Sequence, residues 1–136
     1  MKVFISHSHE TRALAKKLGE ALERAGLEAW NHEQEILPGD NWAKKIAQAL
    51  EESQAMVVLL SPDSLDSTMV RREIEYALST KHFSRRLIPV LVGSEDDLPL
   101  EKLPWILNHL NVIKLPAYGR QEEGIDRITQ ALQAVA

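Results

Sequence analysis

The first candidate for chemistry is a short polar run near the start of the chain, after the apolar residues 3–5. The run consists of Ser6, His7, Ser8, His9 and Glu10. Hydroxyl groups and exposed backbone N–H groups at the start of a helix suit phosphate or ribose binding. The same residue types are also common there as caps and turn formers. His7 and His9 are two residues apart, so they would bind a metal ion only with ligands from elsewhere. The spacing alone leaves ligand binding and a local structural role both open.

The second candidate is a carboxylate, Glu73, in a segment for which the spacing predicts a helix over residues 68–80. At about 100° per residue, Glu73 lies at the edge of the apolar stripe of this helix, whereas Glu75 faces more toward solvent. Met69 is four residues before Glu73 and on the same side. A carboxylate at the rim of an apolar face is a candidate for chemistry. The alternative is a boundary residue paired with a nearby arginine. The stripe consists of Val70, Ile74, Ala77 and Leu78.

Five apolar stretches predict the strands that must position these residues: Val3–Ile5, Leu27–Asn31, Ala55–Leu60, Leu87–Val92 and Val112–Leu115. The third stretch is apolar without alternation, which indicates burial on both faces, as in the middle of a parallel sheet. Pro89 within the fourth stretch is a mild conflict, because an interior strand seldom tolerates a missing N–H. Trp30, near the end of the second stretch, fits either a core position or a stacking platform.

Helices are predicted between these strands. One covers residues 10–25 and ends at Gly26. Another follows a polar loop at residues 32–40 and begins at Asp40 as its N-cap, with Trp42, Ile46, Ala49 and Leu50 facing inward. The last helix has an apolar side formed by Ile125, Ile128, Leu132 and Val135. Residues 93–110 are predicted to be irregular, with one helical turn near Trp105 and a solvated loop at 95–97.

Strands that alternate with helices predict an α/β fold, flavodoxin-like and three-layered, with helices on both faces of the sheet. The expected sheet has five parallel strands in the order 2-1-3-4-5. In such sheets ligands bind beyond the carboxyl ends of the strands, at the point where the strand order reverses. Here that crevice lies between residues 6–10 and residues 61–69, so both candidates lie beside it.

Length and composition disfavour several classes of protein. The length of 136 residues predicts one domain, 1–136, and leaves open whether it is part of a larger protein. The net charge of −4 argues against general nucleic-acid binding. No apolar run approaches the roughly 18 residues of a membrane-spanning helix. The absence of cysteine excludes disulfides and thiolate metal sites, and it favours the cytoplasm.

Three common functions of related folds are disfavoured by missing motifs. No glycine-rich turn follows the first strand, as dinucleotide-binding Rossmann domains require, and no phosphate-binding loop of the G-x-x-x-x-G-K-[ST] type is present. A phosphorelay receiver domain would need an acidic pair after the first strand and an Asp at the end of the third. Ser6 and His7 stand at the first position and Ser61 at the second.

Several stretches in order, across nearly the whole chain, resemble the Toll/interleukin-1 receptor (TIR) domain family, prokaryotic type. Residues 3–8 resemble its first box, and residues 57–61 with 67–74 resemble its third strand and catalytic helix. The loop of its second box is resembled by Ile36, Leu37, Pro38, Gly39 and Asp40, followed by Trp42.

The resemblance implies an enzyme that cleaves NAD+ at the nicotinamide–ribose bond, giving nicotinamide and ADP-ribose or a cyclic variant, in immune or antiviral signalling. NAD+ would be a substrate, and no cofactor is expected. The family's catalytic glutamate lies four residues after a tryptophan, and these positions are Glu73 and Met69 here. The residues implied to contact the substrate are Ser6, His7, Ser8, Trp30, Leu37 and Met69.

The resemblance also implies self-association through TIR–TIR contacts, with residues 36–40 as the assembly loop and a sensor domain or effector protein as a further partner. The alternative is a scaffold that recruits other TIR domains without turnover. Met69 in place of the tryptophan favours the scaffold, whereas Glu73 and the hydroxyl-rich first loop favour the enzyme.

Overall fold

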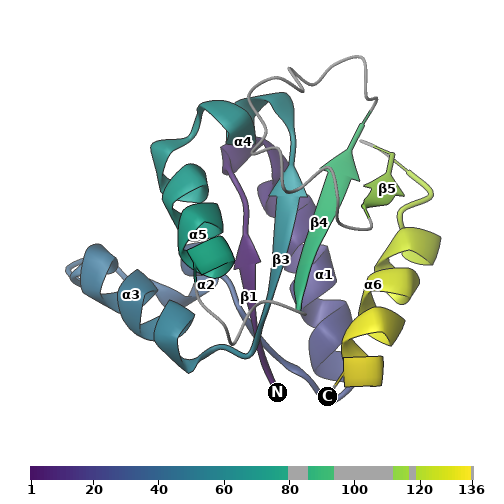
Figure 1. Ribbon diagram of the computed structural model, residues 1–136, viewed down its shortest axis with the longest axis horizontal. Coiled ribbons are helices and arrows are strands. Elements are labelled where there is room, and N and C mark those ends of the chain that lie inside the picture. Colours follow the sequence, from purple (N-terminus) through teal and green to yellow (C-terminus); the bar gives the residue numbers. More distant parts are fainter. Residues whose placement is uncertain (80–85, 94–111, 117–118, 136) are drawn as a thin grey trace.

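The computed structural model describes residues 1–79, 86–93, 112–116 and 119–135. They contain one five-stranded parallel sheet in the order β2-β1-β3-β4-β5, which confirms the predicted α/β fold and strand order (Figure 1). The strands are β1 (Lys2–Ser6), β2 (Glu28–Trp30), β3 (Ala55–Leu60), β4 (Leu87–Val92) and β5 (Ile113–Leu115). The helices are α1 (Arg12–Arg24), α2 (His32–Glu35), α3 (Trp42–Glu52), α4 (Pro62–Asp66), α5 (Thr68–Ser79) and α6 (Glu122–Val135).

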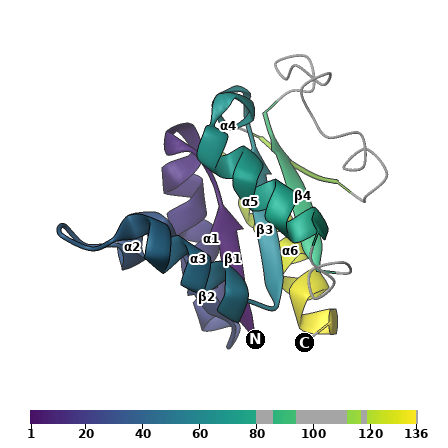
Figure 2. The same ribbon diagram turned by 60° about the vertical axis from the view of Figure 1, so that its left-hand side comes forward.

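Helices cover both faces of the sheet, as Figure 2 shows: α3 and α5 lie over one face, and α1 and α6 lie over the other. Because side chains alternate along a strand, Val3 and Ile5 of β1 pack toward α1 and α6, whereas Phe4 packs toward α3. The same alternation divides β3, which is buried at every residue, as its continuous apolar sequence predicts.

The end of α1 confirms the predicted stop at Gly26. The N–H of Gly26 donates to the carbonyl of Glu23 at 3.0 Å, and the N–H of Leu27 donates to the carbonyl of Leu22 at 3.0 Å. This pair of bonds is a Schellman motif, and it requires the positive φ of 86° that glycine adopts without strain. At the other end of the helix, residues 9–11 form a 3-10 turn before α1 begins at Arg12.

Pro89 lies in β4 as predicted, opposite Val58 of β3. The described pairing of β4 with β5 begins one residue later, at Val90. Pro89 therefore has a described strand neighbour on one side only. This position reduces the conflict between a proline and the interior of a sheet, because a residue with one strand neighbour has fewer ladder hydrogen bonds to lose.

Two predictions near α3 are wrong. The N-cap is Asn41 rather than Asp40, since the Asn41 side chain accepts from the N–H of Lys44 at 3.2 Å. Trp42 is 59% exposed and is not a core residue, although Ile46, Ala49 and Leu50 are buried as expected. Trp42 is the first residue of α3, so helical spacing places it in line with the inner face without giving it anything to pack against.

Two short helices differ from the predicted loops. Residues 32–35 form α2 within the segment predicted to be a polar loop. After β3, Ser61 ends the strand and caps α4 through a reciprocal capping box with Ser64, and Pro62 occupies the first turn. The prediction for residues 94–110, including the turn near Trp105 and the 95–97 loop, lies outside the described residues. No helix of the described segments is long and apolar enough to cross a membrane.

Candidate functional site

A buried pair formed by Ser6 and Glu73 is the centre of the site. Ser6 ends β1 two residues after Phe4, so the alternation of the strand turns its side chain toward α5. Its Oγ donates a hydrogen bond to Oε1 of Glu73 at 2.7 Å. Glu73 is only 2% exposed and is therefore buried more deeply than the helical spacing predicts. Within the described part of the chain, its second oxygen, Oε2, is buried and has no hydrogen-bond partner.

The environment changes the acidity of this carboxyl group. Burial raises the pKa of Glu73 to about 7, because desolvation penalises the ionised form. The hydrogen bond from Ser6 acts in the opposite direction, since it stabilises the carboxylate. Near neutral pH the group is therefore divided between its ionised and protonated forms, which is unusual for a glutamate and typical of residues at functional sites.

His7 is held rigidly beside this pair. Its side chain is buried, with Nδ1 2.9 Å from the carbonyl oxygen of Ser8 and Nε2 2.8 Å from Oδ1 of Asn31. Its ring stacks on that of His32, with centroids 4.7 Å apart and 19° between the planes. Both nitrogens of His7 are thus engaged in hydrogen bonds. Among the described residues, no group of three or more His, Cys, Asp or Glu side chains could hold a metal ion.

One hollow opens at the carboxyl ends of β1 and β3, where the crevice is predicted, and two further hollows beside α3 and α5 share lining residues with it. The first, of about 350 Å³, is lined by His7, Ser8, His9, His32, Asp63, Asp66, Ser67 and Met69. The second, of about 360 Å³, shares His32 and Met69 with it and adds Ile36, Trp42 and Ile46. The third, of about 470 Å³, lies between α3 and α5, and its lining includes Met69, Arg72, Glu73 and Tyr76. Met69 borders all three hollows, and Glu73 lines the third.

The structure brings some of the predicted site residues together and leaves others apart. Ser8 lines the first hollow, and its Oγ has no hydrogen-bond partner within the described segments. Trp30 is 8% exposed and stacks on Phe4 with ring centroids 5.0 Å apart, so it is a core residue. Neither Trp30 nor Leu37 lines the three hollows. His32 and Asn31, which the sequence did not single out for the site, lie against His7.

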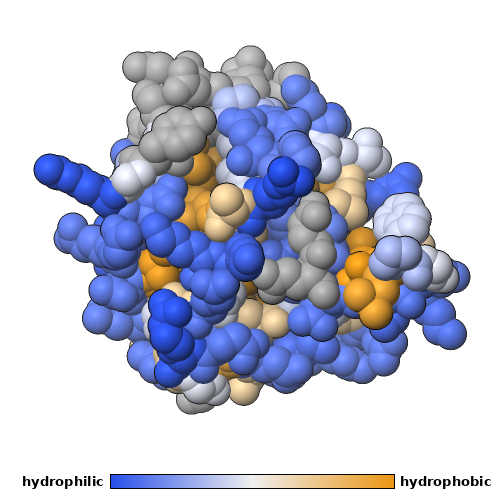
Figure 3. All heavy atoms as spheres, turned by 180° about the vertical axis from the view of Figure 1, so that it is seen from behind, coloured by the Kyte–Doolittle hydropathy of each residue, from blue (hydrophilic) through white to orange (hydrophobic). Residues whose placement is uncertain are grey.

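Leu37 instead lies on the loop of residues 36–40, where it is 64% exposed. The N–H of Asp40 donates to the carbonyl of Leu37 at 3.0 Å, and the Asp40 side chain accepts from the N–H of Leu37 at 2.8 Å. Pro38 followed by Gly39 at a φ of 91° fits a type II turn. The loop therefore presents Leu37 on an ordered turn. Figure 3 shows an apolar cluster at this end of the molecule, on its right-hand side.

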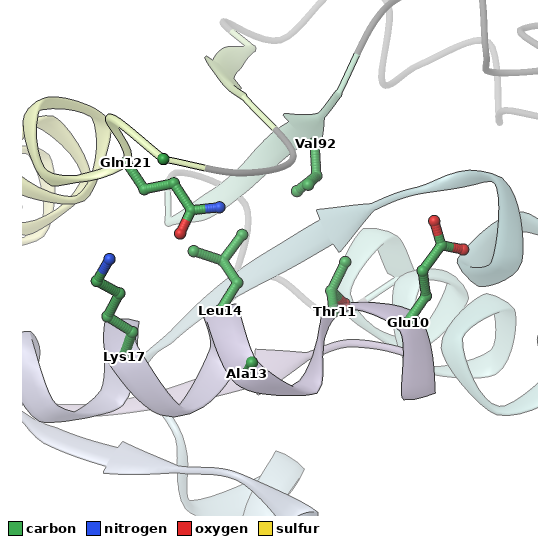
Figure 4. Close-up of a pocket in the computed structure, with 8 residues that line it drawn as sticks. Glu10, Thr11, Ala13, Leu14, Lys17, Val92 and Gln121 are labelled. Atoms are coloured by element: carbon green, nitrogen blue, oxygen red, sulfur yellow. The ribbon is translucent and has the colours of Figure 1, made fainter.

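Another cavity, of about 320 Å³, lies on the other side of the sheet between α1, β4 and the residues before α6 (Figure 4). Leu14 and Lys17 of α1 face it, with Gln121 opposite (Figure 4). Lys17 is paired with Glu122 at 3.1 Å, and Gln121 donates to the carbonyl of Pro116 at 3.1 Å. None of the predicted catalytic or substrate-binding residues lines this cavity.

Comparisons with known proteins agree with the observed fold. A family model described as TIR domain matches residues 3–129. The chain is 26% identical over 102 residues to the probable 2′ cyclic ADP-D-ribose synthase TcpO of Methanobrevibacter olleyae. It is 29% identical over 93 residues to the NAD(+) hydrolase TcpA of Theionarchaea archaeon (strain DG-70-1). These matches cover 74% and 67% of this chain but only 29% and 28% of the two relatives. The chain thus spans less than a third of their length.

Two solved structures have the same fold. The metazoan TIR-STING receptor from C. gigas is similar with a TM-score of 0.76 at 26% identity, over 96% of this chain and 38% of that one. The TIR domain of the Toll-related receptor TRR-2 from Hydra magnipapillata is similar with a TM-score of 0.72 at 24% identity, over 98% of this chain and 95% of that one.

Proposed function

Because the chain belongs to the TIR domain family, we propose that it cleaves NAD+ at the nicotinamide–ribose bond, with Glu73 as the catalytic residue. The products would be nicotinamide and ADP-ribose or a cyclic ADP-ribose variant, used as a signal in immune or antiviral defence. The observation that carries this proposal is the buried hydrogen bond from Ser6 to Glu73, where Glu73 lines the hollow between α3 and α5 and Met69 joins that hollow to the one at the strand ends. The names of the two relatives, a hydrolase of NAD+ and a probable cyclic ADP-ribose synthase, support it.

One carboxylate is enough for this reaction. Breaking the N-glycosidic bond builds oxocarbenium character on the ribose, while nicotinamide leaves as a good, neutral group. A general acid is not needed, in contrast to ordinary glycosidases with two carboxyl groups. Glu73 would stabilise the developing positive charge with Oε1 held by Ser6 and with Oε2 able to accept from a ribose hydroxyl. The low dielectric of a buried position strengthens this electrostatic effect.

A non-catalytic scaffold is the second candidate, and two exposed apolar side chains favour it. Leu37 is 64% exposed and Trp42 is 59% exposed, both at the same end of the molecule. Such side chains suit a contact with another protein, and a second TIR domain is the partner proposed here. Self-association by this surface is also compatible with catalysis, because the carboxylate of Glu73 is nearly closed to solvent in the single chain. Assembly would then open or complete the site.

The test is nicotinamide release from NAD+, measured by chromatography over a wide range of protein concentration. We expect the rate to rise faster than in proportion to concentration, because residues 36–40 of one copy would complete the site of another. Sedimentation measured in parallel gives the size of the assembly. A rate strictly proportional to concentration, with a monomer throughout, would contradict activation by assembly. No nicotinamide at any concentration would leave the scaffold as the better function.

The hydrogen bond from Ser6 predicts a specific pH effect. The reaction requires ionised Glu73, so kcat/KM should rise with pH and reach half of its maximum near pH 7, the pKa of the free enzyme. In Ser6→Ala the carboxylate loses the bond that lowers its pKa, and we expect the midpoint to move to higher pH. At pH 6 the variant should therefore be slower than the wild type by a larger factor than at pH 9. An equal factor at both values would show that Ser6 does not set the ionisation of Glu73.

A further inference from the structure

We propose that His32 is the platform on which the nicotinamide ring of NAD+ stacks, an inference that rests on the proposed function. The chain has Met69, which carries no ring, at the position where the resemblance places a tryptophan. His32 borders two of the hollows that Met69 borders, and its imidazole has a defined orientation because it is stacked on His7. The ring surface for the substrate would thus come from the segment after β2 instead of from α5.

The orientation of His32 is set from behind by His7. His7 is fully buried, and its two ring nitrogens lie 2.9 Å and 2.8 Å from oxygen atoms of Ser8 and Asn31. Two hydrogen bonds on opposite sides of an imidazole fix the plane of its ring. His32 lies almost parallel to that plane, at 19° and a centroid distance of 4.7 Å, within the range of stacked rings. One face of His32 is therefore covered, and the ring is held as a flat wall of the site.

We place the flat ring of the ligand between this wall and Met69. His32 and Met69 are the two residues that the hollows of about 350 Å³ and 360 Å³ have in common, so they border the passage between them. A methionine thioether packs favourably against an aromatic ring and adapts to its position. The nicotinamide of NAD+ is a flat aromatic ring, and stacked arrangements of such rings are favourable.

The position of Met69 also places the reacting bond. Met69 precedes Glu73 by four residues in α5, which corresponds to one turn, or about 6 Å along the helix axis. A ring held against Met69 would bring the ribose that it carries toward Glu73, because the glycosidic bond joins the two directly. The adenine of NAD+ is the other ring that could stack here, but it lies across the diphosphate from the bond that breaks. The geometry therefore favours nicotinamide over adenine.

The test measures binding rather than turnover, in a Glu73→Gln background in which cleavage of NAD+ is expected to be roughly 100- to 1,000-fold slower. His32→Leu removes the ring and keeps an apolar side chain, and His32→Phe restores a ring. Calorimetry would be done with NAD+, with nicotinamide mononucleotide, which contains the nicotinamide ring, and with ADP-ribose, which lacks it. We expect His32→Leu to weaken binding of the first two probes roughly tenfold, in keeping with the value of one stacked base. His32→Phe should recover most of the loss, and ADP-ribose should bind all three proteins equally.

Other outcomes distinguish failure of this inference from failure of the proposed function. If ADP-ribose loses affinity in His32→Leu while nicotinamide mononucleotide does not, the stacked ring is adenine and the inference is overturned. If all probes bind equally to His32→Leu and to the protein that keeps His32, the ring has no role, and the proposed function stands. If none of the three probes binds even with His32 present, both the inference and the proposed function fail. In the active protein, His32→Leu should raise KM with little change in kcat, which distinguishes a substrate platform from general damage to the fold.

Discussion

Glu73→Gln is expected to lower the rate of nicotinamide release by roughly 100- to 1,000-fold, the usual effect of removing one group that stabilises charge in a transition state. Glutamine has the size and shape of glutamate, and its amide oxygen can still accept the hydrogen bond that Ser6 donates over 2.7 Å. The variant therefore removes the negative charge while keeping the packing. If Glu73 acts only in the transition state, kcat should fall and KM should change little.

Glu75→Gln is the matched control for this experiment. Glu75 lies two residues further along α5 and is exposed. The Glu75→Gln variant therefore makes the same change of charge on the same helix without touching the site. We expect its turnover to stay within about twofold of the wild type, since exposed substitutions rarely alter distant sites. Equal losses in both variants would show that the net charge of α5 matters rather than the Glu73 carboxylate. Unchanged turnover in Glu73→Gln would remove Glu73 from the mechanism.

The fold could be predicted from the sequence because the buried strands are continuous apolar runs. The predicted bounds of β3 and β4, Ala55–Leu60 and Leu87–Val92, are those of the structure, since a continuous apolar run has few alternative conformations in a small α/β domain. The wrong prediction for Trp42 has the opposite origin. Helical spacing says which residues share a face, but it does not say how far along the helix that face remains in contact with the sheet.

The site was less accessible to prediction. The helical wheel of α5 finds Glu73 but places it at the edge of the apolar stripe, because a wheel counts neighbours on one helix and ignores Ser6 from β1. The alternation of β1 could have indicated this contact, since Ser6 shares the face of Phe4. The stacking of His32 on His7 had no such signal, because it depends on α2, a helix too short to show periodicity. The catalytic role of Glu73 stays a prediction.

The same Glu73→Gln variant should be more stable than the wild type at alkaline pH. The pKa of Glu73 is about 7 in the folded chain and near its ordinary value of 4.5 in the unfolded chain. Between these values the folded state keeps a proton that the unfolded state has lost, so the free energy of unfolding falls as the pH rises from about 4.5 to about 7. At about 1.4 kcal/mol per pKa unit, the full loss is about 3 to 4 kcal/mol.

Glutamine does not titrate, so its presence removes this loss. Urea denaturation of both proteins at pH 5 and pH 8 should give a difference in the free energy of unfolding that grows in favour of Glu73→Gln by about 2 to 3 kcal/mol between the two values. Comparing two pH values isolates the ionisation, because any strain or unpaired amide that glutamine introduces is present at both. The pKa of Glu52 is lowered by a hydrogen bond from Lys2, and that of Glu122 is lowered by a backbone hydrogen bond and by Lys17, but both groups are common to the two proteins and cancel. A difference that does not change with pH would mean that ionisation of the buried Glu73 carboxyl group does not destabilise the folded protein. A growing difference, together with lost turnover, would show that the chain keeps a charged carboxylate at the expense of stability because the reaction needs it.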